Sequence, residues 1–138
     1  MALDETAVST LMEALGIEIT AITPDEVVAT MPVHGPTHQP FSILHGGASV
    51  ALAETVASAG TAHLLDLSRQ IPVGLEINAN HVRSKRDGVV TARAVPLHKG
   101  RSTMVWDIRI TDEEGRLISV SRCTVAIIDR QPGSRNLS

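Results

Sequence analysis

One acidic residue stands inside a long run of apolar and small residues. Glu54 is the only aspartate or glutamate between Glu26 and Asp66, and residues 48–60 around it read ASVALAETVASAG. Burying a carboxylate among apolar groups is unfavourable unless it is paired or has a task. Because burial favours the protonated form, such a carboxylate is also a stronger base near neutral pH. We therefore predict a catalytic role for Glu54, in preference to that of an exposed glutamate on a less buried helix.

The residues just before this run could stabilise a negative oxygen. His45, Gly46 and Gly47 stand where a helix would begin, and the first turn of a helix has backbone N–H groups without partners. Glycine lets a ligand come close to those groups. Taken alone, the three residues favour a flexible loop-to-helix junction over an oxyanion site. Glu54 follows Gly47 by seven positions, two helical turns, so both are predicted on about the same side.

Three further polar side chains surround these two features. Ser58 follows Glu54 by four residues and shares its helical face, where it could hold the carboxylate or a water, or simply pack as a small residue. Gln39 could donate to a carbonyl oxygen, and His45 could orient the loop before the helix. A water-satisfied loop residue is the alternative for both.

The periodicity of apolar residues predicts the elements that would position these groups. Helices are predicted at residues 5–15 and 46–65, a loop at 34–44, and strands at 17–22, 26–33, 71–79, 88–97, 102–111 and 117–128. In the strand at 71–79 the odd-numbered residues should share one face. The helix at 46–65 is apolar nearly all round, which predicts a buried helix. The pattern favours an α+β fold in which one antiparallel sheet wraps this helix.

Length and composition set the remaining bounds. The 138 residues predict one domain, over residues 1–129, with a flexible tail at 130–138. A net charge of −3 and only two aromatic residues, Phe41 and Trp106, argue against a nucleic-acid partner. The stretch 48–65 is too polar to span a membrane. The single cysteine, Cys123, and the acidic start of the chain, with no secretory signal, favour a cytoplasmic location.

In combination, these motifs resemble the hotdog-fold thioesterases. The resemblance rests on HQPFSILHGGAS at 38–49, LAET at 52–55, GLEINANH at 74–81 and PLHKGR at 96–101, and extends over about residues 15–128. The most similar branch contains the Arthrobacter-type 4-hydroxybenzoyl-CoA, 1,4-dihydroxy-2-naphthoyl-CoA and enterobactin-proofreading thioesterases. The resemblance implies a hotdog fold, hydrolysis of an acyl-CoA thioester to free acid and CoA, and no cofactor.

The resemblance also implies a role for each site residue. Glu54 would be the nucleophile or general base, the Gly46 N–H would polarise the thioester carbonyl, Gln39 and His45 would orient carbonyl and loop, and Ser58 would assist the water. The site would lie between the subunits of a homodimer or homotetramer, with Gln39 and His45 facing Glu54 of the partner chain. Contacts to CoA would fall on Gly74, His81, Val82, Arg83, Ser84, His98, Lys99, Gly100, Arg101, Ser102 and Thr103.

Ser84 stands where relatives often have proline, which could alter the CoA-side loop. Among the nearby cations, Lys85 and Arg86 are interpreted as ordinary solvated strand ends rather than phosphate ligands.

Other chemistries are weighed against this hypothesis. His34 and His38 lie in a segment that contains glycine and proline and has no nearby Cys or Asp, so we predict no metal site. Ser49 nearly matches a nucleophile elbow but lacks its last glycine, and Cys123 is interpreted as core packing. A hotdog lyase, a proofreading thioesterase on acyl carrier proteins and a non-catalytic acyl-CoA-binding protein remain as alternatives.

Overall fold

The computed structural model describes residues 10–131. In chain order its elements are α1 (Leu11–Leu15), β1 (Glu18–Thr23), β2 (Glu26–Pro32), the short 3-10 helix η1 (Gly35–Thr37), α2 (Gly46–His63), β3 (Gln70–His81), β4 (Val89–Lys99), β5 (Thr103–Thr111) and β6 (Leu117–Asp129). The predicted order of two strands, a long helix and four strands is confirmed, with most ends within two residues of the prediction. The first predicted helix is too long at its start, because Thr10 has an extended backbone and is the N-cap of α1, and residues 5–9 lie outside the described part.

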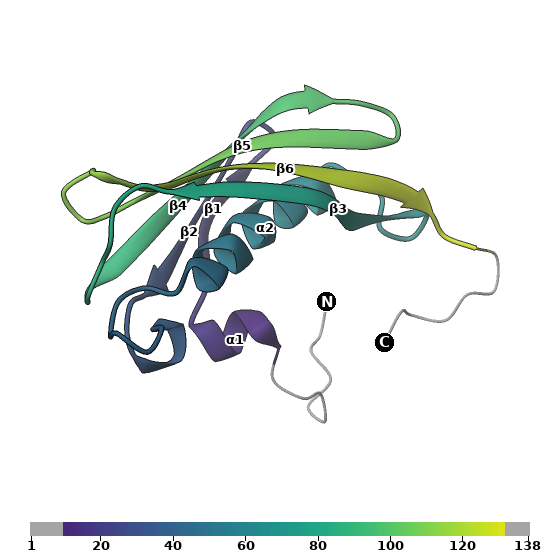
Figure 1. Cartoon of the computed structure of the whole chain (residues 1–138). Helices are drawn as coiled ribbons and strands as arrows, with labels where there is room; N and C mark the ends of the chain where they lie inside the picture. Colours follow the sequence, from purple (N-terminus) through teal and green to yellow (C-terminus); the bar gives the residue numbers. More distant parts are fainter. Residues whose placement is uncertain (1–9, 132–138) are drawn as a thin grey trace.

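The strands form one six-stranded antiparallel sheet in the order β1-β2-β4-β5-β6-β3. The sheet curves over α2, which runs along its concave side (Figure 1). This arrangement confirms the predicted α+β architecture of a sheet wrapped around one helix. The long connection 33–69, which includes α2, separates β2 from β3, and these two strands are not neighbours in the sheet.

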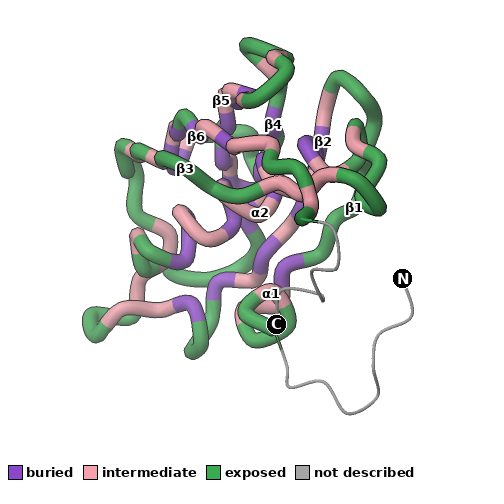
Figure 2. Tube along the Cα trace, turned by 90° about the vertical axis from the view of Figure 1, so that its right-hand side faces the viewer, coloured by how far each residue is buried: buried purple, intermediate pink, exposed green. Residues whose placement is uncertain are grey.

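The core lies between one face of α2 and the inner face of the sheet. Ala, Val and Leu side chains of the helix pack here against alternate residues of β2, β4, β5 and β6. Trp106 is fully buried and donates its indole N–H to Thr61 Oγ1 at 3.0 Å, while Gly60 leaves room for its ring. Figure 2 shows the buried segments, in purple, on α2 and on the strands that surround it.

The helix α2, predicted as a buried helix, is buried along one face in the single chain. Its buried residues are Ala48, Ser49, Leu52, Ala53, Val56, Ala57, Gly60 and Thr61, which form one face. Val50 is half-buried on the opposite face. The sheet covers the helix from one side only, so the second face of small residues is partly open to solvent.

The predicted alternation along β3 is also wrong at its centre. The pairing of β3 with β6 shifts register between Gly74 and Glu76, so a bulge breaks the two-residue period. Leu75 is therefore 65% exposed, whereas Ile77 packs against the core. The bulge lies directly beside Gly74, which faces α2.

At the C-terminal end, Arg130 is tied to the fold. Its backbone N–H donates to Arg69 O at 2.8 Å and its side-chain Nε donates to Leu67 O at 2.6 Å. The tail predicted to be flexible from residue 130 is therefore held at its first residue, and residues 132–138 lie outside the described part. Within residues 10–131, no helix is long and apolar enough to cross a membrane.

Candidate active site

The start of α2 is a histidine-capped helix end followed by two glycines. His45 is the N-cap, and its Nδ1 accepts the N–H of Gly47 at 2.8 Å, while its own N–H donates to Thr37 O at 2.8 Å. A Cβ on Gly47 would press on the His45 ring, and one on Gly46 would lie 3.0 Å from His81 Nε2. The glycines therefore let two imidazoles close on the helix start and keep its backbone accessible.

The loop before the helix turns Gln39 toward its own backbone. Gln39 N–H donates to Ile43 O, Ser42 N–H donates to Gln39 O, and Ser42 has a positive φ of 62°. The side-chain Oε1 of Gln39 accepts the N–H of Phe41. Since this bond occupies the oxygen, the amide N–H groups of Gln39 have no protein partner among the described residues and remain available as donors.

These groups line one of two hollows beside α2. This hollow has a volume of about 360 Å³ and is lined by Gln39, Ile43, Leu44, Gly46, Ser49, His81, Val82, Arg83, Ser84 and Ile118. We call Gln39, Gly46 and residues 81–84 the amide half-site, because its chemistry is that of N–H donors and one guanidinium. The structure brings together here the predicted carbonyl-binding residues and the first predicted CoA segment.

Glu54 lines the other hollow, on the outer face of α2. Its volume is about 670 Å³, and the helix contributes Gly47, Val50, Ala51, Glu54, Thr55, Ser58, Ala59 and Ala62, while α1 and β3 contribute Leu11, Met12, Pro72 and Gly74. The lining is thus apolar or small apart from Glu54, Thr55 and Ser58. We call Glu54, Ser58 and Gly74 the carboxylate half-site. The prediction that Gly47, Glu54 and Ser58 share one side of the helix is confirmed.

The Glu54 carboxylate lies against the backbone of β3. A Cβ on Gly74 would collide with Glu54 Oε1, so glycine at this position is what makes room for the carboxylate. Glu54 is half-buried and makes no hydrogen bond or ion pair with any residue in the range 10–131. A carboxylate without a partner in an apolar hollow is poised to act on a ligand.

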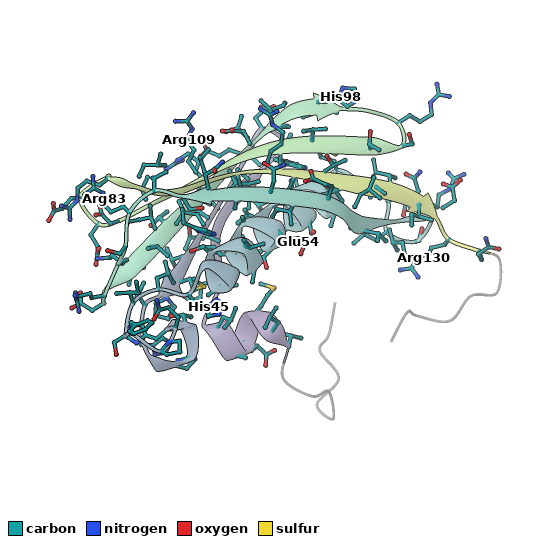
Figure 3. All side chains as sticks on the ribbon, viewed as in Figure 1. His45, Glu54, Arg83, His98, Arg109 and Arg130 are labelled. Atoms are coloured by element: carbon teal, nitrogen blue, oxygen red, sulfur yellow. The ribbon has the colours of Figure 1, made fainter. Side chains whose placement is uncertain are left out.

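Within one chain the two half-sites remain separate. Glu54 and Ser58 line one hollow, whereas Gln39 and Gly46 line the other. In Figure 3, His45 lies at the start of α2 and Glu54 midway along it. The single chain therefore does not place the predicted carbonyl donors opposite its own Glu54.

The second predicted CoA segment is also distant from the first. Residues 98–103 run from the end of β4 through the turn to the start of β5, and in Figure 3 His98 and Arg83 lie far apart on the sheet. Lys99 pairs with Asp25 at 3.2 Å, and Gly100 N–H donates to Thr103 O at 2.9 Å. Arg83 and Arg101 are exposed and make no ion pair in the described chain, so both are open to an anionic ligand.

Cys123 lies beneath the helix and not in either hollow. It is fully buried, and burial raises the pKa of its thiol to about 11, with the charges of Glu54 and Glu76 acting in the same direction. Because the thiolate is the reactive form, this environment makes the residue inert. The interpretation of Cys123 as a core residue is confirmed. Across residues 10–131, no three His, Cys, Asp or Glu side chains are grouped closely enough to hold a metal ion.

Lys85 differs from the interpretation given to it from sequence. Its side chain is 15% exposed and its Nζ lies 2.6 Å from Glu113 Oε1, so it is not a solvated strand end. The two residues are far apart in the sequence, and neither stands in a motif. The pairing of β3 with β6 and of β4 with β5 brings the loop that carries Lys85 to the turn that carries Glu113.

Comparison with known proteins agrees with this geometry. A family model described as "Thioesterase superfamily" matches residues 41–119, more than half of the chain. The 1,4-dihydroxy-2-naphthoyl-CoA hydrolase of Listeria monocytogenes is 50% identical over 117 residues, which cover 85% of this chain and 94% of that protein. The proofreading thioesterase EntH of Cronobacter turicensis is 48% identical over 127 residues, 92% of each chain.

Solved structures extend the similarity to three dimensions. The Staphylococcus aureus protein SAV0944, solved as a glutamate-to-alanine mutant, superposes with a TM-score of 0.86 at 49% identity, covering 88% of this chain and 100% of that one. A glutamine-to-alanine mutant of thioesterase PA1618 from Pseudomonas aeruginosa gives a TM-score of 0.85 at 44% identity, covering 88% and 87% of the two chains.

Proposed function

The chain belongs to the thioesterase superfamily and is a hotdog-fold thioesterase, and from this premise we propose that it hydrolyses acyl-CoA thioesters to a free acid and CoA. The observation that carries the proposal is the Glu54 carboxylate, which is half-buried without a partner in an apolar hollow, against a glycine that leaves it space. An apolar hollow suits an acyl group, and among residues 10–131 the Glu54 carboxylate is the one acidic side chain that lines it.

The proposed reaction divides the work between the two half-sites. Gly46 N–H and the Gln39 amide donate to the thioester carbonyl oxygen as it gains negative charge. Glu54 acts at the carbonyl carbon in one of two ways. It attacks directly, which gives a mixed anhydride that water then hydrolyses to restore the carboxylate, or it takes a proton from an attacking water, which Ser58 helps to hold. In either case the C–S bond breaks, CoA leaves as the thiol after gaining a proton, and water supplies the oxygen of the free acid. This chemistry requires no metal or cofactor.

A site with both functions needs two chains. Each chain offers the donors in one hollow and the carboxylate in another, so a second copy could set its amide half-site opposite Glu54 of the first. The edge strand β3, which carries Gly74, has no strand neighbour on one side, and an unpaired edge can pair with another copy. We propose a homodimer with two intersubunit sites, and pairs of dimers as a homotetramer.

The substrate proposal is an aryl or medium-chain acyl-CoA. The small side chains of the outer face of α2, Ala51, Ala59 and Ala62, leave room for a bulky acyl group. The unpaired guanidinium groups of Arg83 and Arg101 suit the CoA phosphates. CoA thioesters are made and consumed inside cells, which supports a cytoplasmic location.

A proofreading thioesterase that acts on acyl carrier proteins is the second candidate. The 48% identity to EntH favours it, and the reaction at the carbonyl carbon would be the same. The two candidates differ in what the exposed residues near Arg83 and His98 must recognise, a free nucleotide or a protein surface.

The experiment is a thiol-release assay with a chromogenic disulfide on a panel of benzoyl-CoA, short-chain and medium-chain acyl-CoAs, and the same acyl groups on a carrier protein. Steady release from CoA substrates, lost in Glu54→Gln and kept in the exposed control Glu18→Gln, is the expected result. Tight CoA-ester binding without turnover would replace hydrolysis with a non-catalytic binding role, and release from carrier substrates alone would favour proofreading.

A further inference from the structure

An ion pair outside both hollows joins two loops that are distant in the sequence. Lys85 lies in the 82–88 loop between β3 and β4, and Glu113 lies in the turn between β5 and β6. Their charged atoms are 2.6 Å apart, and the Lys85 side chain is only 15% exposed. The other carboxylate oxygen of Glu113 accepts the N–H of Val89 at 3.1 Å. One glutamate therefore holds both ends of the stretch 85–89.

The turn that presents Glu113 is itself fixed from within. The Asp112 side chain is 2% exposed, and its Oδ1 accepts the N–H groups of Glu114 and Arg116, both at 2.9 Å. Its Oδ2 receives Arg116 Nε at 2.8 Å. A carboxylate that accepts three hydrogen bonds in one tight turn leaves the next residue little freedom, so Glu113 is a firm anchor.

The loop that Lys85 belongs to carries the amide half-site. The Lys85 carbonyl accepts the N–H of Leu44 at 2.8 Å, and Leu44 immediately precedes the helix cap His45. Arg86 O lies 2.8 Å from His38 Nε2. The same loop begins with Val82 and continues through residues that line the amide hollow. Movement of Lys85 would therefore shift both the helix start and the hollow's far wall.

Glycine at position 88 allows Glu113 and Lys85 to lie close to the loop backbone. Its φ is +79°, and a Cβ there would collide with Glu113 Oε2 and lie 3.2 Å from Lys85 Nζ. Glycine thus meets two requirements at this position, a left-handed backbone and the seating of the ion pair.

We propose that the Lys85–Glu113 pair is a clasp that positions the amide half-site, by fixing the loop whose carbonyl holds Leu44 and whose first residues line the hollow. Neither side chain lines the hollow, so both are positioning residues and not catalytic ones. The kinetic consequence rests on the proposed function, since it assumes that Gly46 and residues 82–84 act on a thioester substrate.

The clasp should matter more for rate than for stability. Ion pairs with one exposed partner contribute little to the free energy of unfolding, and Glu113 is half exposed. Displacing a donor by a fraction of an ångström is costly for a reaction, because transition-state stabilisation depends on donor geometry. If the pair were purely structural, breaking it would lower the free energy of unfolding and leave the rate of the folded enzyme unchanged.

The test uses three clasp variants, namely Lys85→Met, Glu113→Gln and the two combined. The control is Glu26→Gln, which removes a different 2.6 Å ion pair, Arg93–Glu26, outside the loop. Each clasp variant should lose about tenfold in kcat/KM, with kcat lowered and KM raised, well below its melting temperature. The double variant should lose no more than a single one, because one interaction is broken in all three. Losses that multiply in the double variant, or an equal loss in Glu26→Gln, would overturn the proposal.

Amide hydrogen exchange gives a readout that does not depend on the substrate. Peptides that cover residues 38–45 and 82–88 should exchange faster in Glu113→Gln than in the wild type. Their exchange rates in Glu26→Gln should equal those of the wild type. Absence of thiol release by the wild type on every substrate would refute the proposed function, and exchange would still test the clasp. Unchanged exchange refutes the clasp, and faster exchange with wild-type kcat and KM refutes its positioning role.

Discussion

The amide half-site and the carboxylate half-site lie on the same helix and are held by different kinds of interaction. Polar contacts hold the first, including His45 with Gly47, Leu44 with Lys85, and Lys85 with Glu113. The second is held by packing, with Glu54 seated among small residues against Gly74. Donors must be aimed, which hydrogen bonds do well, whereas an unpartnered carboxylate must be kept free of protein donors. Each half can therefore be broken by a different kind of change.

Glu54→Gln should have the largest effect, because it removes the only reactive group of the carboxylate half-site while keeping its shape. We expect kcat to fall by about 10³-fold, the scale of losing a catalytic acid, base or nucleophile. Thiol release measures the rate, and circular dichroism checks that the fold is kept. Activity within tenfold of the wild type would show that another group performs the chemistry.

Gly74→Ala should break the same half-site by crowding instead of chemistry. The added Cβ collides with Glu54 Oε1, so the carboxylate must move, and kcat should fall by about 10- to 100-fold. Gly35→Ala is the matched control, since a Cβ there meets nothing within 4 Å and its φ is not positive. Equal kcat values for Gly74→Ala and Gly35→Ala would mean that the position of the Glu54 carboxylate against Gly74 does not affect the rate.

Strong acid should loosen the amide half-site. The hydrogen bond from Lys85, assisted by the backbone N–H groups of Glu113 and Val89, lowers the pKa of Glu113 from 4.5 to about 2. Its contribution to stability is present above pH 4.5 and is lost as pH falls through about 2, because the unfolded chain binds the proton first. Because Glu113 is half exposed, this contribution is small, and the urea midpoint of the wild type should fall only slightly more steeply over this range than that of Glu113→Gln. Parallel curves would contradict the assignment.

Cys123, which is buried in the core outside both hollows, should give the smallest effect. With its thiol pKa raised to about 11 by burial, we expect negligible alkylation by iodoacetamide at pH 8 in the folded protein and rapid alkylation in urea. Cys123→Ala should retain kcat within about twofold, because the thiol is not the nucleophile. Rapid labelling of the folded protein together with loss of activity would point to cysteine chemistry.

Glu54, the helix start and six strands could be predicted from sequence because each has a local signal. A lone acid in an apolar run, glycines at a helix start and alternating apolar residues all reflect short-range requirements. The bulge at Leu75 could not be predicted, because alternation does not reveal an extra residue in one strand. The open outer face of α2 was missed because its small residues resemble those of the buried face.

The separation of the two half-sites and the Lys85–Glu113 pair lie beyond local sequence patterns. The first depends on how the sheet curves around α2, and the second depends on the pairing of β3 with β6 and of β4 with β5, which brings residue 113 beside residue 85. Neither charge differs in type from its exposed neighbours in the same loops. Long-range geometry alone distinguishes them.

Subunit mixing tests most directly whether two chains build one site. Glu54→Ala and Gln39→Ala homodimers should both be nearly inactive, and after co-refolding half of the dimers are mixed, each with one intact site. The mixture should then recover about a quarter of the wild-type rate, because one site in four joins an unaltered Glu54 to an unaltered Gln39 of the other chain. A mixture no more active than its two parents would show that Glu54 and Gln39 act within the same chain, and the intersubunit site would be refuted.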